Sequence, residues 1–213
     1  MSNGYFILEN EEQIGPFSLK ELTERDIENH SKILVPGNEE WQDACDLPEL
    51  YPYFESIGVY LPTGDNLASF WMRLLAYIAD YFILAILTNY VLYLFAFTTG
   101  KTFAIHTYSD IFKMSISDMI LLQIITGVTL IVYNTAGEVS QLKGSIGKFL
   151  FRLVVVDVEG YGQSFLTALL RNFVKVFSVF FLYLGFLPIF FTEHRQAIHD
   201  LLAKTYVVRK SIL

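Results

Sequence analysis

The sequence is poor in cysteine and in charged side chains. Cys45 is the one cysteine among 213 residues, which excludes an intrachain disulfide and a cysteine-rich zinc site. Charged residues make up 17% of the chain, against about 25% in soluble globular domains. Hydrophobic residues reach 53% and aromatic residues 16%, which excludes the disordered, collagen-like and coiled-coil classes. A soluble domain of this size could not bury so much apolar surface, so the composition indicates a membrane protein.

Positive charge is scarce in the first part of the chain. Residues 1–62 hold three Lys or Arg against thirteen Asp or Glu, a balance of −10, whereas residues 63–213 have a balance of +3. This contrast predicts an acidic soluble head followed by an apolar, mildly basic body. The acidic head argues against nucleic acid as a partner, because nucleic-acid-binding domains present a basic surface. The first thirty residues also lack the basic start and apolar core of a secretory signal.

The chain is predicted to contain two domains. Residues 1–54 are expected to form a small soluble α+β domain, and residues 67–213 an all-α membrane domain. Residues 55–66 are interpreted as a linker, because Pro62 and Gly64 interrupt any periodic pattern there.

Local signals in the head predict two strands and a short helix. Residues 5–8 and 13–17 are expected to be the strands, separated by a polar turn. Ser18 and Glu21 have the spacing of a capping box, which predicts that a helix starts after Ser18. The residues expected to complete a small core are Trp41, Ala44, Leu47 and Leu50.

Three segments of the head resemble a GYF-like domain of the kind that bacteria fuse to membrane segments. The segments are Tyr5-Phe6, Gly15-Pro16-Phe17-Ser18 and Glu40-Trp41-Gln42. The resemblance implies a module that binds a protein or a proline-rich peptide on aromatic side chains, which suits the preformed polyproline II conformation. Tyr5, Phe17 and Trp41 are the candidate peptide-binding residues, and the alternative is that each simply belongs to the core.

Three apolar stretches follow the head. Residues 74–97 contain one charge and span ~36 Å as a helix, enough to cross a bilayer core of ~30 Å with some tilt. Residues 116–136 form a second candidate span. Residues 173–191 form a third stretch, which Gly185 and Pro188 interrupt.

The distribution of basic residues predicts the topology. Placing residues 137–172 and the C-terminal tail inside puts eight Lys or Arg inside and two outside, as the positive-inside rule requires. We therefore expect two full spans, a broken third apolar segment that returns to the same side, and both termini in the cytoplasm. The valine-rich runs 152–158 and 205–209 predict a short two-stranded β pairing on the cytoplasmic side.

The first span contains a carboxylate that is costly in hydrocarbon. Placing Asp80 in the bilayer costs about 2.5–3.5 kcal/mol on insertion scales. Arg73 lies seven residues earlier, on the same helix face but ~10 Å away along the axis, too far for a direct pair unless the arginine bends inward. Asp200 is the nearest chemical candidate for a further partner.

Four spaced blocks in the body resemble the RDD family of bacterial integral membrane proteins, named for one arginine and two aspartates. They are residues 70–80, 147–157, 169–172 and 199–205. The family letters fall on Arg73, Asp80 and Asp200, and further residues expected at the cytoplasmic face are Lys148, Arg152, Arg171 and His199. The resemblance implies a multi-pass protein of the bacterial cytoplasmic (inner) membrane. Transport, including cation/proton exchange, has been proposed for the family.

Two functions remain open at this point. In the first, Asp80 binds a monovalent cation or a proton and Arg73 tunes its pKa; transport would then need a homo-oligomer, because two or three helices cannot enclose a polar path. In the second, the charge cluster is structural and the chain is a membrane-anchored adaptor whose head binds a cytoplasmic protein or peptide. No enzymatic motif is present, so we expect no enzyme activity, cofactor or metal, and the lipid bilayer is the principal partner.

Overall fold

The computed structural model describes residues 4–103, 114–180 and 184–211. The chain divides into two compact units, which are described separately: Met1–Leu61 with Glu159–Tyr161, and Pro62–Val158 with Gly162–Ser211. The division falls between Leu61 and Pro62, inside the segment expected to be a linker.

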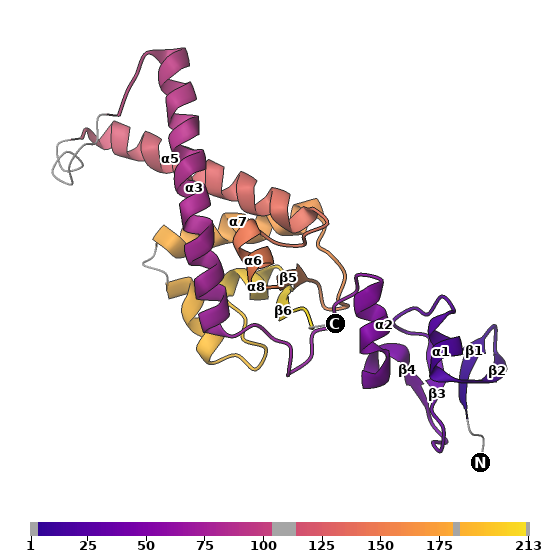
Figure 1. The fold of residues 1–213 in the computed structure, drawn as a ribbon. Helices are drawn as coiled ribbons and strands as arrows, with labels where there is room; N and C mark the ends of the chain where they lie inside the picture. The colour runs from indigo at the N-terminus through magenta and orange to yellow at the C-terminus, as the bar shows by residue number, and fades with distance from the viewer. Residues whose placement is uncertain (1–3, 104–113, 181–183, 212–213) are drawn as a thin grey trace. The chain divides into compact units, whose positions relative to one another are not determined.

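The first unit is built on a four-stranded antiparallel sheet (Figure 1). Its strands are β1 (Tyr5–Glu9), β2 (Glu12–Phe17), β3 (Lys32–Leu34) and β4 (Trp41–Asp43), in the order β2-β1-β3-β4. The strands expected at residues 5–8 and 13–17 are both present, and they form a hairpin in which Tyr5 lies opposite Phe17. The prediction of a small β-containing head is confirmed.

Short helices complete this unit. They are α1 (Leu19–Thr23), the 3-10 helices η1 (Ala44–Asp46) and η2 (Pro48–Leu50), and α2 (Tyr51–Ser56). The predicted capping box is present: the Ser18 hydroxyl accepts from the Glu21 backbone N–H at 3.3 Å, and the Glu21 carboxylate accepts from the Ser18 backbone N–H at 2.8 Å.

The core of the first unit lies on one face of the sheet, covered by the short helices. Its buried members are Ile7, Leu22, Ile27, Ile33, Ala44, Leu47, Leu50, Phe54 and Val59. Three of the four residues expected in this core, Ala44, Leu47 and Leu50, are buried in it. Val59 belongs to the core as well, so the packing of the head extends into the predicted linker.

Trp41 lies on the other face of the sheet. Residues directly opposite each other on neighbouring antiparallel strands share a face. Phe6 is paired with Leu34 and Leu34 with Trp41, whereas Ile7 and Ile33, one position along, are buried in the core. The prediction that Trp41 belongs to the core is therefore wrong, because strand alternation directs its row away from the core. We call Phe6, Leu34 and Trp41 the outer row.

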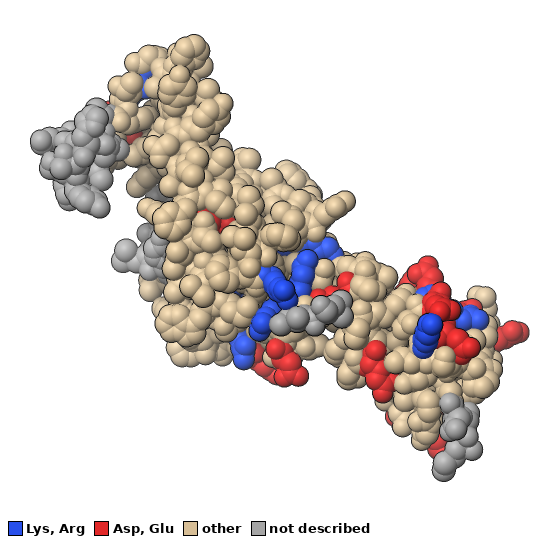
Figure 2. All heavy atoms as spheres, viewed as in Figure 1, with Lys and Arg blue, Asp and Glu red and all other residues tan. Residues whose placement is uncertain are grey.

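The second unit begins with two long helices, α3 (Phe70–Thr99) and α5 (Ile116–Val139). Among the described residues, these two helices are long and apolar enough to cross a membrane. They contain the predicted spans 74–97 and 116–136 and extend them by a few residues. Ser69 and Ser115 cap their N-termini by accepting backbone N–H groups. In Figure 2 the surface over these helices carries almost no charged side chains, as a lipid-facing surface requires.

The predicted β pairing is present in the second unit. Strand β5 (Leu153–Val156) pairs antiparallel with β6 (Tyr206–Arg209), and all four residues of β5 are buried. The short helix α6 (Ile146–Leu150) precedes β5 and packs against α3, while α8 (Ile198–Leu202) precedes β6. Which side of the membrane this pairing occupies stays a prediction.

The third apolar stretch, 173–191, does not coincide with one element. Helix α7 (Phe165–Phe180) begins before it, and the 3-10 helix η3 (Leu184–Phe190) contains Pro188. Residues 181–183 lie outside the described part of the chain. The return of this stretch to the same side of the membrane stays a prediction.

Helix α7 has its polar side chains turned inward. The buried positions at helical spacing are Ala168, Arg171, Asn172, Lys175 and Ser178. Its exposed positions are large and apolar: Phe165, Leu166, Leu169, Leu170, Phe173 and Phe177. A helix on the surface of a water-soluble protein shows the opposite pattern, so the exposed face of α7 is suited to lipid.

Candidate functional site

Charged side chains from five elements meet beside the N-terminal end of α3 and the C-terminal end of α5. We call them the ion cluster, which consists of Arg73, Glu138, Lys148, Arg171 and Asp200. Both carboxylates are buried, and the side chains of Arg73 and Lys148 are each 12% exposed. Buried charges are costly unless each has a partner, so the pairing inside the cluster decides whether it can exist.

Asp200 binds two arginines. Its Oδ2 lies 2.5 Å from Arg73 Nη1, and its Oδ1 accepts from Arg171 Nη2 at 2.6 Å and from Nε at 3.0 Å. Oδ2 also accepts the Ala197 backbone N–H at the start of α8. Burial alone would raise the pKa of Asp200, but the positive charges around it, Arg171 foremost, hold that pKa well below its ordinary value. Asp200 is therefore ionised at neutral pH.

Glu138 provides the second centre of the cluster. Its carboxylate binds Arg171 Nη1, accepts from Lys148 Nζ at 2.6 Å, and accepts from Asn172 Nδ2 at 2.9 Å. Arg171 therefore bridges two carboxylates that lie 62 positions apart in the sequence. Because the guanidinium offers a planar fork of donors, it reaches Asp200 through Nε and Nη2 while Nη1 reaches Glu138.

Asp80 has a different environment. Its Oδ1 accepts from the Tyr133 hydroxyl at 2.6 Å and from the Gly147 backbone N–H at 2.7 Å, while Oδ2 accepts from the Ser145 hydroxyl at 2.5 Å. Of the residues that the structure describes, no Lys, Arg or His nitrogen lies within 4.0 Å of this carboxylate. Arg73 is thus paired with Asp200 and not with Asp80.

Gly147 allows α6 to approach α3 this closely. A Cβ atom at position 147 would lie 2.2 Å from the Ala76 carbonyl oxygen and 2.7 Å from the Asp80 carboxylate. Any side chain there would push α6 away and break the hydrogen bond from the Gly147 N–H. The absence of a side chain at position 147 therefore allows the hydrogen bond that holds the Asp80 carboxylate.

Of the two remaining predicted residues, His199 contacts the ion cluster and Arg152 does not. His199 Nε2 lies 3.4 Å from Asp200 Oδ1, and its ring packs edge-on against Phe186. Burial lowers the pKa of His199 to about 3, so the ring is neutral at pH 7 and its contact with Asp200 is not an ion pair. Arg152 is exposed at the end of α6 and lies outside the cluster.

The candidate peptide-binding residues of the head are not brought together. Tyr5 and Phe17 are opposite each other and pack against the core, and the Tyr5 hydroxyl donates to Glu49. Arg25 lies over the Phe17 ring, 4.2 Å from its centroid. Trp41 belongs to the outer row on the other face of the sheet.

Several polar residues of the second unit were not predicted from the sequence. Glu138 belongs to the ion cluster and accepts from Asn172; Tyr133 and Ser145 donate to Asp80; and Lys175 donates to Asn134 Oδ1 at 3.1 Å. Polar side chains at positions 171, 172 and 175 of an otherwise apolar helix are a signal that could identify the inward face of α7. Within the described residues, no group of three or more His, Cys, Asp or Glu is placed to hold a metal ion.

Two apolar helices, a buried ion cluster at one end of them and a small β-rich head define the class: a helical membrane protein with a β-rich N-terminal unit. A family model for the RDD family matches residues 67–204, and the chain belongs to that family. A model for GYF domain 2 matches residues 5–50. The chain is 30% identical over 149 residues to the uncharacterized protein YxaI of Bacillus subtilis (strain 168), which covers 67% of this chain and 97% of that protein. No solved structure matches the chain.

Proposed function

We propose that this RDD-family chain is a non-enzymatic, membrane-anchored adaptor whose GYF-type head binds a protein or proline-rich peptide. The observation that carries the proposal is the outer row. Phe6, Leu34 and Trp41 lie half-buried across three neighbouring strands, on the face of the sheet opposite the core. A stripe of this kind offers an aromatic surface to a polyproline II segment, which loses little conformational entropy on binding.

The charge of the head indicates the chemistry of the partner. Residues 1–62 have a balance of −10, and Glu39 and Glu40 are exposed immediately before Trp41. Figure 2 shows Asp and Glu side chains spread over the head. A partner that combines proline with Lys or Arg would therefore be attracted to the outer row, and its binding should weaken as salt is added.

The second unit supports an anchoring role better than cation/proton exchange at Asp80. Both oxygens of Asp80 already accept hydrogen bonds, from Tyr133, Ser145 and Gly147. A cation bound there would have to displace these donors. Asp200 is likewise occupied by two arginines, so the carboxylates of this unit stabilise the packing of α3, α5, α6 and α7.

The topology of the proposed adaptor follows from the two long helices. The start of α3 and the end of α5 both lie at the ion cluster, which supports placing the segments before and after this helix pair on one side of the membrane. We assign that side to the cytoplasm of a bacterium, because it carries most of the Lys and Arg residues. The head would then meet its partner at the inner membrane surface.

A fluorescence titration of the full-length chain in detergent tests the proposal. The chain has two tryptophans, so Trp71→Phe makes Trp41 the only tryptophan reporter. A synthetic proline-rich peptide with flanking arginines is the probe, and saturable change in Trp41 emission is expected. Affinity should fall as salt is raised.

Substitutions in the head then locate the binding surface with dye-labelled peptide. Trp41→Ala should weaken binding by at least about tenfold, as expected for a buried aromatic anchor. Ile57→Ala is the matched control, because Ile57 is an apolar head residue that is 52% exposed outside the outer row. Absence of saturable binding by the wild type, or equal affinity of the wild type and Trp41→Ala, would refute the proposal.

A further inference from the structure

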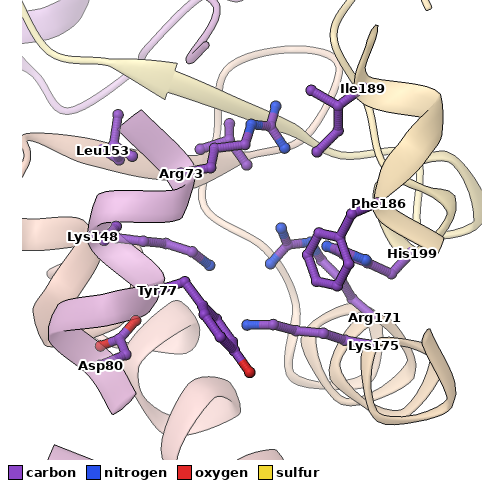
Figure 3. Close-up of a pocket in the computed structure, with 12 residues that line it drawn as sticks. Arg73, Tyr77, Asp80, Lys148, Leu153, Arg171, Lys175, Phe186, Ile189 and His199 are labelled. Atoms are coloured by element: carbon purple, nitrogen blue, oxygen red, sulfur yellow. The ribbon is translucent and has the colours of Figure 1, made fainter. Parts of the chain in front are cut away.

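A small cavity lies next to the ion cluster, and four of its twelve lining residues are Lys or Arg. Its volume is about 40 Å³, and its charged lining residues are Arg73, Asp80, Lys148, Arg171 and Lys175. In Figure 3 the nitrogen-bearing ends of Lys148, Arg171 and Lys175 point into the same central space from opposite sides. We call this space the basic cavity.

The charges around the basic cavity balance only when one basic group is neutral. Arg73, Lys148, Arg171 and Lys175 can supply four positive charges, while the carboxylates that contact them or line the cavity are Asp80, Glu138 and Asp200. Burial lowers the pKa of Lys175 to about 7, so this ammonium is the group that gives up its proton most readily. One monovalent anion bound beside it would let Lys175 keep the proton without leaving a net charge.

Donor groups are also available to such an anion. Arg73 Nη2 is buried without a hydrogen-bond partner in the described part of the chain. The Lys175 ammonium carries three protons; it donates to Asn134 Oδ1 and lies 5.8 Å from the centroid of the Tyr77 ring. Lys175 is 6% exposed, so it has little access to water.

An apolar groove adjoins the basic cavity and shares four of its lining residues. The groove has a volume of about 360 Å³ and is lined by Phe70, Arg73, Leu74, Tyr77, Ile78, Phe186 and Ile189. It follows the first turns of α3, and Ile78 on its wall is 45% exposed. In a helix that crosses the membrane, such a groove is open to lipid, and an occupant would come from the bilayer.

We propose that the basic cavity and this groove together bind a single-chain lipid by its carboxylate, as in a fatty-acid anion. The carboxylate supplies a negative charge that matches the protonated Lys175 and accepts from the unpartnered Arg73 Nη2, and the chain fills the groove beside Arg73. The size of the cavity favours this head group. A cavity of about 40 Å³ leaves room for a small head group such as a carboxylate, whereas a phosphodiester brings further attached groups that need more space.

The experiment measures binding of tritiated oleate to the full-length chain in an uncharged detergent. Unlabelled oleate, oleyl alcohol and phosphatidic acid are the competitors. Saturable binding that oleate displaces at least about tenfold better than the other two is expected, because a charge-assisted hydrogen bond is lost without the carboxylate. Equal displacement by oleyl alcohol would overturn the proposal, and stronger displacement by phosphatidic acid would overturn the assignment of a carboxylate head group.

Two substitutions test the two halves of the site. Lys175→Met removes a charge at similar length and should weaken oleate binding by about tenfold or more, whereas Lys101→Met, in an exposed pair with Asp118, should leave it unchanged. Ile78→Trp narrows the groove without changing any charge and should also weaken binding, so the test remains decisive if Lys175→Met does not fold. Wild-type affinity in a folded Lys175→Met or Ile78→Trp protein would overturn the proposal.

Discussion

Replacing Asp200 by asparagine tests whether the ion cluster holds the second unit together. The substitution keeps the shape of the side chain but removes the negative charge shared by Arg73 and Arg171. Arg171 would keep Glu138, but Arg73 would keep no carboxylate among the described residues. Breaking a buried pair by removing one partner costs about 3–5 kcal/mol. For a chain of this size, that loss lowers Tm by roughly 6–20 °C.

The assay is thermal denaturation in detergent, followed by size-exclusion chromatography of the protein that remains dispersed. Asp118→Asn is the matched control, because it breaks the exposed pair with Lys101 at the other end of the helices. Exposed pairs contribute about 0–1 kcal/mol, so Asp118→Asn should shift Tm by no more than about 4 °C. Equal shifts for Asp200→Asn and Asp118→Asn would refute the view that burial makes the cluster essential.

Three further predictions concern neighbouring groups. Gly147→Ala should lower the free energy of unfolding by about 1–3 kcal/mol, because the new Cβ would lie 2.2 Å from the Ala76 carbonyl oxygen. Its control is Gly64→Ala, which meets no atom within 4 Å, and equal Tm values for the two variants would contradict the reasoning. Lowering the pH from 7 to 5 should lower the free energy of unfolding by about 2 kcal/mol, because the pKa of His199 drops from 6.5 to about 3 on folding and the proton binds to the unfolded chain. His199→Gln should therefore flatten the dependence of Tm on pH. An unchanged curve would exclude His199 as the origin of this dependence. Asp80→Asn should lower Tm but leave the affinity for the proline-rich peptide unchanged; wild-type cation-dependent proton flux in proteoliposomes that vanishes in this variant would favour exchange over the adaptor.

The sequence predicted the elements of the head better than the direction of their side chains. The capping box fixed the start of α1 because Ser18 and Glu21 form a local pattern of hydrogen bonds. The prediction that Trp41 belongs to the core is wrong because β4 contains three residues, too few for the alternation of side chains to show which of them face the core. Its face follows only from the register with Leu34, a contact between strands that the local sequence does not contain.

In the second unit, the charge of a side chain predicted its partner better than its position along the helix did. The expectation that Arg73 needs a partner beyond its own helix, with Asp200 as candidate, agrees with their 2.5 Å contact. The partners of Asp80 could not be inferred, because a hydroxyl such as that of Tyr133 or Ser145 is common in any sequence and carries no charge to match. The basic cavity likewise depends on how α3, α6 and α7 pack, which periodicity within one helix does not determine.

The pairing of Arg73 with Asp200 has a consequence for biosynthesis. The two residues are 127 positions apart in the chain. At ~5–20 residues per second, a ribosome adds Asp200 roughly 6–25 s after Arg73. During that interval α3 can already enter the membrane, while Arg73 has its local hydrogen bond to the Ala68 carbonyl but not the carboxylate that will neutralise it. Completion of α8 is then the step that neutralises the arginine and locks the helices in place.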